Sequence, residues 1–219
     1  MNQKTIVVFL SALLFSTPLA MPVQAAGGTC EGLKSLSLPN TTITLAETVA
    51  RGAFVPPAGR QGRGGAVFAD TPSFCRVAAT LAPSKDSDIR IEVWLPASGW
   101  NGKFQAVGNG GWAGAISYPA LAQAVSAGYA GASTDTGHTG NNGTFASGHP
   151  ERVIDFGYRA VHEMTVQAKA IVGAYYTSAP KLSFWNGCSL GGRQGITEAM
   201  RYPSDFNAIV AGAPAVNAM

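Results

Sequence analysis

The residues best placed to do chemistry lie in one short segment, Gly187-Cys188-Ser189-Leu190-Gly191. It matches the pattern Gly-x-Ser-x-Gly, in which a serine hydroxyl sits on a sharp turn between a strand and a helix. An apolar run, 182–185, precedes the segment, and a helical pattern, 192–201, follows it. This context favours Ser189 as a nucleophile that attacks an ester carbonyl. The alternative is a glycine-rich turn that carries a serine by chance.

A nucleophilic serine of this kind needs backbone N–H groups that hold the oxyanion of the tetrahedral intermediate. The loop Gly108-Asn109-Gly110-Gly111-Trp112 follows an apolar run, 104–107, and has few side chains to block such an approach. We predict that the N–H groups of Gly110, Gly111 and Leu190, the residue after the nucleophile, form the oxyanion hole. The alternative for this loop is a plain glycine-rich turn.

The general base of a serine esterase is missing after Ser189. In catalytic triads of this type the acid and then the histidine follow the serine along the chain. No histidine follows Ser189, and the acidic residues after it are Glu198 and Asp205. The sequence therefore predicts a nucleophile without its triad partners.

The three histidines, His138, His149 and His162, all precede the serine. His162 lies in a helical pattern, where we expect a packed or surface role. His138 ends a predicted strand, so it is a candidate for substrate contact, together with Trp112. The alternative, which we favour, is that Asp135 and His138 cap their own loop.

The segments that must position these residues alternate between strands and helices. Residues 75–81 and 89–95 alternate apolar and polar side chains, which is typical of half-buried strands. Further strands are predicted near Ile43 and at 104–107, 129–133, 182–185 and 208–211. Helices are predicted at 119–127, from a cap at Asp155 onward, and at 192–201. Short apolar strands that alternate with amphipathic helices indicate an α/β fold, with a mostly parallel sheet and helices on both faces. The strands before residue 100 form its antiparallel leading edge.

Composition excludes some classes of function. The net charge is +3, and the basic residues form no run. We therefore expect no nucleic-acid partner. Charged residues make up only 12% of the chain and 27 residues are glycine, which favours a well-buried, loop-rich domain.

The N-terminal segment predicts export. Lys4 is the only charged side chain in residues 1–26, an apolar run, 6–14, follows it, and Val23-Gln24-Ala25 offers small residues for cleavage. This is the layout of a secretory signal peptide, so we predict a signal in 1–26 and the mature domain in 27–219. The apolar run is shorter than the about 20 residues that a membrane-spanning helix needs. The expected location is therefore secreted or periplasmic, without membrane association after cleavage.

The cysteine count of three is odd for an exported chain. Cys30 and Cys75 both precede the alternating core strands and are able to pair. Cys188 is then either a free buried thiol or the partner of a cysteine outside this sequence.

Several segments together resemble the tannase and feruloyl esterase family, which includes the bacterial mono(hydroxyethyl) terephthalate hydrolase. The most specific feature is the Cys188-Ser189 pair inside the serine motif. The resemblance covers roughly residues 30–215 and rests on 186–195, 108–111, 133–138, 158–162 and 202–206.

The resemblance implies an α/β-hydrolase fold and a second set of residues that complete the site. In that family the cysteine before the serine pairs with a cysteine directly after the catalytic histidine, so Cys188 is expected to pair beyond this chain. Cys30 and Cys75 then form the family's N-terminal disulfide. The triad acid, the histidine and a lid domain that often holds a structural calcium are expected after Met219. Residues 27–219 are thus expected to be the N-terminal part of the catalytic domain, with no metal or cofactor of their own.

Two hypotheses of function follow. The first is a secreted serine carboxylic-ester hydrolase whose partner is a small aromatic ester, of the gallate or ferulate type. The second is a non-catalytic protein, either an inert fragment or a hydrolase-like binding module. Because the base is missing, we expect residues 27–219 alone to be inactive under either hypothesis.

Overall fold

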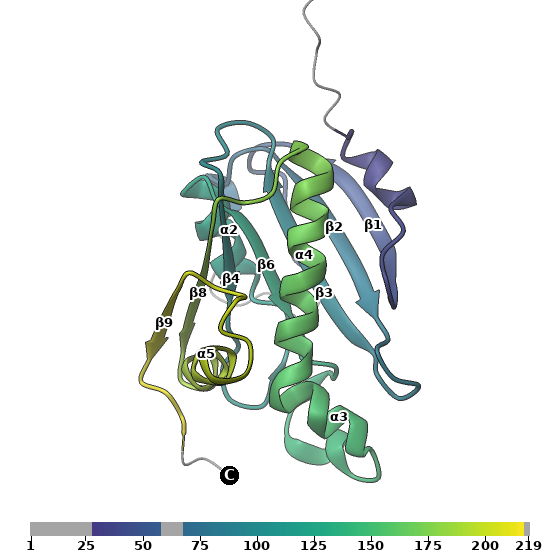
Figure 1. The fold of residues 1–219 in the computed structure, drawn as a ribbon. Coiled ribbons are helices and arrows are strands. Elements are labelled where there is room, and N and C mark those ends of the chain that lie inside the picture. The colour runs from purple at the N-terminus through teal and green to yellow at the C-terminus, as the bar shows by residue number, and fades with distance from the viewer. Residues whose placement is uncertain (1–27, 58–67, 217–219) are drawn as a thin grey trace, which may run out of the picture.

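The computed structural model describes residues 28–57 and 68–216. The predicted signal peptide, residues 1–26, lies outside this part of the chain. The described strands form a seven-stranded sheet in the order β1-β2-β3-β6-β4-β8-β9 (Figure 1). Their bounds are β1 Thr41–Val49, β2 Phe74–Leu81, β3 Ile89–Pro96, β6 Ala130–Thr134, β4 Lys103–Val107, β8 Leu182–Cys188 and β9 Ala208–Gly212.

The sheet has an antiparallel and a parallel part. β1, β2 and β3 pair antiparallel, and β3 also pairs antiparallel with β6. From β6 onward the pairs β6–β4, β4–β8 and β8–β9 are all parallel. The predicted antiparallel leading edge and the parallel part after it are both present, but this sheet is mixed rather than mostly parallel, with three antiparallel and three parallel strand pairs. The carboxyl ends of the parallel strands share one edge, where α/β proteins place their ligands.

Helices cover both faces of the sheet, as predicted. α2 (Tyr118–Ser126) and α4 (Ala160–Tyr176) lie on opposite sides of β3. Ile91 of β3 packs in the same apolar cluster as Met164 of α4. Trp94, on the opposite face of β3, packs in a second cluster with Leu121 of α2. α5 (Leu190–Arg201) packs against β8 and β9 (Figure 1).

One charged position departs from the alternation that the sequence suggested. Arg90 is exposed, as expected, but Glu92 on the same face of β3 is buried. A carboxylate is buried at this position because it pairs with Arg76 of β2, its diagonal neighbour across the two strands, with Nη2 2.5 Å from Glu92 Oε1. Trp94 Nε1 also donates to Glu92, at 3.0 Å. Burial opposes the charge of Arg76, but the hydrogen bond and the charge of Glu92 raise its pKa overall.

The prediction that Asp155 caps the long helix is wrong. The helical segment begins earlier with α3 (Pro150–Ile154) and continues through a π-helical turn, η3 (Asp155–Arg159), into α4. Pro150 starts it because proline lacks the N–H that the first turn leaves unpaired and has the helical φ. Asp155 is fully buried within the helix, and its Oδ1 accepts a 2.6 Å hydrogen bond from Arg159 Nε.

Four short elements were not predicted from the sequence. Two are 3₁₀ turns and two pair as a small antiparallel ladder beside the main sheet. They are η1 (Glu31–Ser35), η2 (Gly143–Ala146), β5 (Ala113–Gly114) and β7 (Gly140–Asn141).

A disulfide joins Cys30, directly before η1, to Cys75 in β2, with a Cα–Cα distance of 5.5 Å. This is the pairing that the resemblance implied. Cys188 is a free thiol in this structure and is exposed rather than buried. Across 28–57 and 68–216, no helix has both the length and the apolar character needed to cross a membrane.

Candidate active site

Ser189 occupies the sharp turn that the motif predicted. β8 ends at Cys188 and α5 begins at Leu190, so a single residue connects strand and helix. Ser189 has φ 59° and ψ −118°, a backbone conformation that residues with a side chain rarely adopt. Its N–H donates to Gly212 O of β9 at 3.0 Å, and its side chain is exposed. The turn therefore presents the hydroxyl at the carboxyl edge of the parallel strands.

Close backbone packing requires glycine in the serine motif and at the start of the loop after β4. A Cβ on Gly187 would lie 2.4 Å from Gly191 O, and one on Gly108 would lie 2.6 Å from Gly191 Cα. Real Cβ atoms do not approach backbone this closely. The helix therefore packs directly against the loop after β4, and only glycine permits that approach.

The loop after β4 is held rigidly by Asn109, a residue that the sequence analysis did not single out. Its buried side chain donates from Nδ2 to Ala115 O at 2.9 Å and to Thr134 O at 2.8 Å. Its own O accepts the N–H of Gly191 at 2.8 Å, and Gln194 bonds to both its backbone N–H and its side-chain oxygen. These bonds tie the loop to the first turns of α5.

The predicted oxyanion donors remain available in this arrangement. The N–H of Gly191 is used by Asn109, but no backbone carbonyl of the described residues accepts the N–H of Leu190, Gly110 or Gly111. Leu190 is the first residue of α5, so its N–H belongs to the positive end of the helix dipole. The geometry is compatible with the predicted hole, whose composition stays a prediction.

A small cavity of about 140 Å³ opens beside the serine. A cavity of about 150 Å³ is large enough for a benzene ring, so one aromatic ring of a substrate fits here. One wall is a stacked pair, Trp112 on Phe156, with ring centroids 5.2 Å apart and planes within 9°. The cavity is lined by Gly111, Trp112, Phe156, Ser189, Leu190, Arg193 and Ala215. Of the predicted site residues, Gly110 and His138 lie outside this lining.

Arg193 is a further residue of this cavity that the sequence analysis did not identify. It lies one helical turn after the serine, and its N–H donates to Ser189 O at 3.1 Å. Helical side chains lean toward the N-terminus, so the guanidinium points back toward the serine's end of α5. It lies 5.9 Å from the ring centroid of Phe156, and no carboxylate of the described residues forms an ion pair with it.

His138 supports the loop after β4 through a contact with the main chain of Trp112. It is 5% exposed, its Nε2 lies 2.8 Å from Trp112 O, and its ring stacks on Phe145 with centroids 3.9 Å apart. Nε2 carries the proton in this contact, because a carbonyl oxygen only accepts. This arrangement supports the interpretation that His138 stabilises its loop.

The other two histidines are also engaged away from the serine. Nδ1 of His149 lies 2.9 Å from the carboxylate of Asp86, and Nδ1 of His162 lies 2.7 Å from Asp205 Oδ2. Each histidine of the sequence thus has a polar partner other than Ser189. None of the three is placed as the general base.

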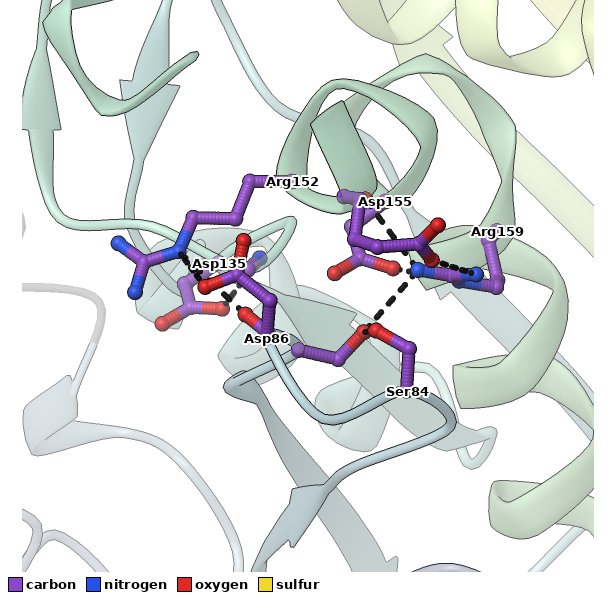
Figure 2. Close-up of polar contacts among 9 residues, drawn as sticks. Ser84, Asp86, Asp135, Arg152, Asp155 and Arg159 are labelled. Carbon is purple, nitrogen blue, oxygen red and sulfur yellow. Dashed lines mark hydrogen bonds and ion pairs between the residues drawn. The ribbon is translucent and has the colours of Figure 1, made fainter. Parts of the chain in front are cut away.

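A network of charged groups holds the segment that carries Phe156 (Figure 2). Arg152 lies 3.4 Å from Asp86, and Arg159 pairs with Asp155 and with Glu151. Arg159 Nη2 also donates to Ser87 Oγ at 3.0 Å, which ties the helix to the turn between β2 and β3. The network fixes the helical segment against the sheet edge and so fixes the aromatic wall of the cavity.

Asp135 caps the end of β6 beside this network, and Figure 2 labels it near Asp86. Its Oδ1 accepts the N–H of Arg90 and the N–H of Gly137, both at 2.9 Å. Burial raises the pKa of Asp135 to about 6, although both hydrogen bonds and the charge of Arg90 act in the opposite direction. The predicted loop cap is thus present, with the aspartate in the capping role.

One group of potential metal ligands occurs in the described part of the chain. His162, Glu198 and Asp205 offer one ligand atom each, all within 4.8 Å of one another. This group could not be predicted from the sequence, because the three residues are far apart along the chain and match no metal motif.

Comparison with known proteins finds consistent matches. The profile of the family described as "Tannase and feruloyl esterase" matches residues 75–219. An uncharacterized esterase of Xanthomonas campestris is 42% identical over 196 residues, which cover 89% of this chain and 33% of that protein. A probable feruloyl esterase B-1 of Aspergillus fumigatus is 43% identical over 147 residues, which cover 67% of this chain and 28% of that protein.

Solved structures give the same picture. Feruloyl esterase B from Aspergillus oryzae superposes with a TM-score of 0.77 at 35% identity, covering 85% of this chain and 36% of that one. Tannin acyl hydrolase from Aspergillus niger superposes with a TM-score of 0.64 at 25% identity, covering 83% and 34%. The chain therefore spans about a third of the length of these relatives.

Proposed function

Because the chain belongs to the tannase and feruloyl esterase family, we propose that it supplies the nucleophile and the oxyanion hole of a serine hydrolase acting on aromatic esters. The observation that carries the proposal is the strained Ser189 turn, which faces Gly111 across a cavity with an aromatic wall. The cavity has the size of one aromatic ring, in agreement with the aromatic acids after which the feruloyl esterase and tannin acyl hydrolase relatives are named.

In the proposed reaction, Ser189 Oγ attacks the ester carbonyl and the carbonyl oxygen gains the negative charge. The N–H groups of Leu190 and of Gly110 or Gly111 stabilise that oxygen. The C–O bond to the alcohol then breaks, the alcohol leaves with a proton, and the acyl group stays on the serine. Water attacks the acyl-enzyme, releases the acid and returns a proton to Ser189.

The base that takes the serine proton is not supplied by the histidines of this sequence, since all three bind elsewhere. We propose that a histidine oriented by an acid comes from the two thirds of the relatives' length that this chain does not span. Cys188, exposed beside the nucleophile, is proposed to form a disulfide that ties this second segment to the turn.

Arg193 gives the cavity a positive wall. With no acidic partner among the described residues, it is proposed to attract the negative or electron-rich substituent of the aromatic substrate.

The test is Ser189→Ala in the full-length protein, with Ser178→Ala as the matched control at another exposed serine. We expect Ser189→Ala to lower kcat toward an aromatic ester by about 10⁴-fold or more, because a lost nucleophile removes covalent catalysis. Labelling by a fluorophosphonate should disappear with it, while Ser178→Ala keeps both. Activity and labelling that survive in Ser189→Ala would refute the assignment. A full-length protein that neither labels nor hydrolyses would favour the non-catalytic binding module.

A further inference from the structure

Three side chains that are capable of binding metal converge where α5, α4 and the turn after α5 meet. His162 lies on α4, Glu198 on α5, and Asp205 in the turn that leads to β9. One ligand atom from each lies within 4.8 Å of the other two. None of these three residues belongs to the lining of the cavity beside Ser189. The group is therefore separate from the proposed esterase site.

Glu198 is the unusual member of this group. Its side chain is fully buried, and neither carboxylate oxygen has a hydrogen-bond partner among the described residues. A buried, ionised carboxylate without a partner costs several kcal/mol or more, so buried carboxylates are normally paired, protonated or metal-bound. The carboxyl therefore needs either a proton or a cation.

Among the described residues, no lysine or arginine forms an ion pair with Glu198 or Asp205. The ammonium group of Lys169 donates to the main-chain oxygen of Asp205 rather than to either carboxylate. The two carboxylates thus face each other and His162 Nδ1, which lies 2.7 Å from Asp205 Oδ2.

We propose that His162, Glu198 and Asp205 form a binding site for a divalent transition-metal cation, of which Zn²⁺ is the representative. One imidazole nitrogen and two carboxylate oxygens are a ligand set that Zn²⁺ accepts, whereas Ca²⁺ and Mg²⁺ prefer oxygen ligands alone. With metal–ligand bonds of about 2.0–2.2 Å, the three atoms reach one ion after small side-chain rotations. The two carboxylates neutralise the charge of the ion.

The surroundings of the histidine support this role. The ring of Tyr202 stacks on His162 with centroids 3.7 Å apart and planes within 10°. Stacking restricts rotation of the imidazole, as groups next to metal ligands commonly do. His162 is the least buried of the three side chains, with 27% of its surface exposed, so an ion enters from its side.

A bound ion would join α4 and α5 through their side chains and add the turn before β9. Because the unfolded chain has no such site, binding stabilises the folded protein. Glu198 lies on α5, which begins directly after Ser189, so the ion would brace the helix that follows the proposed nucleophile without contacting the substrate.

The experiment is a titration of the full-length protein, freed of any affinity tag and stripped with a chelator, with Zn²⁺ by calorimetry. We expect the unmodified protein to bind one Zn²⁺ per chain. The variants Glu198→Gln and His162→Gln should bind Zn²⁺ at this site at least tenfold more weakly. Matched controls are Glu163→Gln, a neighbouring acid on α4, and His149→Gln, a histidine that pairs with Asp86. Both controls should bind Zn²⁺ like the unmodified protein, and the Tm should rise with Zn²⁺ only in proteins that bind.

A second readout does not depend on variants. Co²⁺ bound to the unmodified protein should give visible absorption bands typical of nitrogen and oxygen ligation, and Zn²⁺ should displace it. The proposal is overturned if the unmodified protein binds no Zn²⁺, which would mean that Glu198 holds a proton instead. It is also overturned if Zn²⁺ binding is unchanged in Glu198→Gln, or if Ca²⁺ displaces Zn²⁺ from the site that Glu198→Gln removes. Loss of esterase activity in Ser189→Ala affects none of these outcomes.

Discussion

At the scale of single residues, Arg193 is a cation in an unfavourable place. It lies in the first turns of α5, where the helix dipole favours negative groups and disfavours a cation by about 0.3–1 kcal/mol. It also lacks an acidic partner among the described residues, although it is only partly exposed. Such a position is understandable if the guanidinium serves the cavity beside Ser189 and contributes little to the fold.

We expect Arg193→Met in the full-length protein to lower kcat/KM about tenfold to a hundredfold for an aromatic ester with a ring carboxylate. The expected loss corresponds to one charge-assisted hydrogen bond. A neutral ester of the same size should be affected much less, and Arg193→Lys should retain part of the difference because it keeps the charge. Steady-state kinetics with the two substrates measure the effect. An equal loss for both substrates would show that Arg193 acts on the fold.

Asp135 gives a residue-scale prediction about pH. Its folded pKa of about 6 lies above the ordinary value of 3.8, so the folded state holds the proton more tightly than the unfolded state. Stability from this group is therefore present below about pH 4 and is lost as the pH rises through about 6. Asp135→Asn keeps the oxygen that caps Arg90 and Gly137 but cannot ionise.

Relative to the unmodified protein, Asp135→Asn should gain about 3 kcal/mol between about pH 3 and about pH 8, a range that includes both pKa values, since one pKa unit corresponds to about 1.4 kcal/mol. Urea unfolding at several pH values measures the difference. A constant difference across this range would contradict the raised pKa. Asp88 and Arg90, the charged neighbours of Asp135, are unchanged in both proteins and cancel in the comparison.

At the scale of elements, the disulfide fastens the N-terminal turn η1 to β2. Its cysteines are separated by 45 residues, and on the loop-entropy model a crosslink of this span stabilises by about 4 kcal/mol. We expect the double variant Cys30→Ala, Cys75→Ala to lose about that much free energy of unfolding in urea. Peptide mapping without reduction should find both cysteines linked in the unmodified protein. A free thiol at either position would contradict the pairing.

Elements whose pattern is local were predictable from the sequence. The alternation of apolar and polar residues indicated β2 and β3, although every residue of β3 except Arg90 is buried because helices cover both of its faces. The Ser189 turn was recognisable because glycine, serine and strand-to-helix context coincide within a few residues. The start of the long helix was misplaced because Asp155 resembles a cap. Its partner Arg159 is four residues on in a π-helical turn, which has no distinct sequence pattern.

At the scale of the whole molecule, contacts between distant segments account for what the sequence did not reveal. The burial of Glu92 depends on Arg76 in the neighbouring strand, and the rigidity of Asn109 depends on Gln194, 85 residues later. The role of His138 likewise depends on the carbonyl of Trp112 across the sheet edge. Ser189, Leu190 and Gly111 could be predicted as site residues from their neighbours in sequence, and all three line the cavity. Arg193 became a candidate only because the structure places it in the same lining.

The π-helical turn η3 also sets the rotational phase between the two helical parts that it joins. A π-helical turn holds one more residue than an α-helical turn, so the residues before it are rotated by about 100° relative to a continuous α-helix. That extra rotation allows Phe156 to face the cavity beside Ser189 while Val161 and Met164 face the sheet. Gly157, whose Cβ position is open, is the residue whose removal would disturb packing least. Deleting Gly157 should therefore swing Phe156 away from Trp112 and raise KM for aromatic esters, while fluorophosphonate labelling of Ser189 continues. An unchanged KM would mean that the helix absorbs the deletion elsewhere along its length.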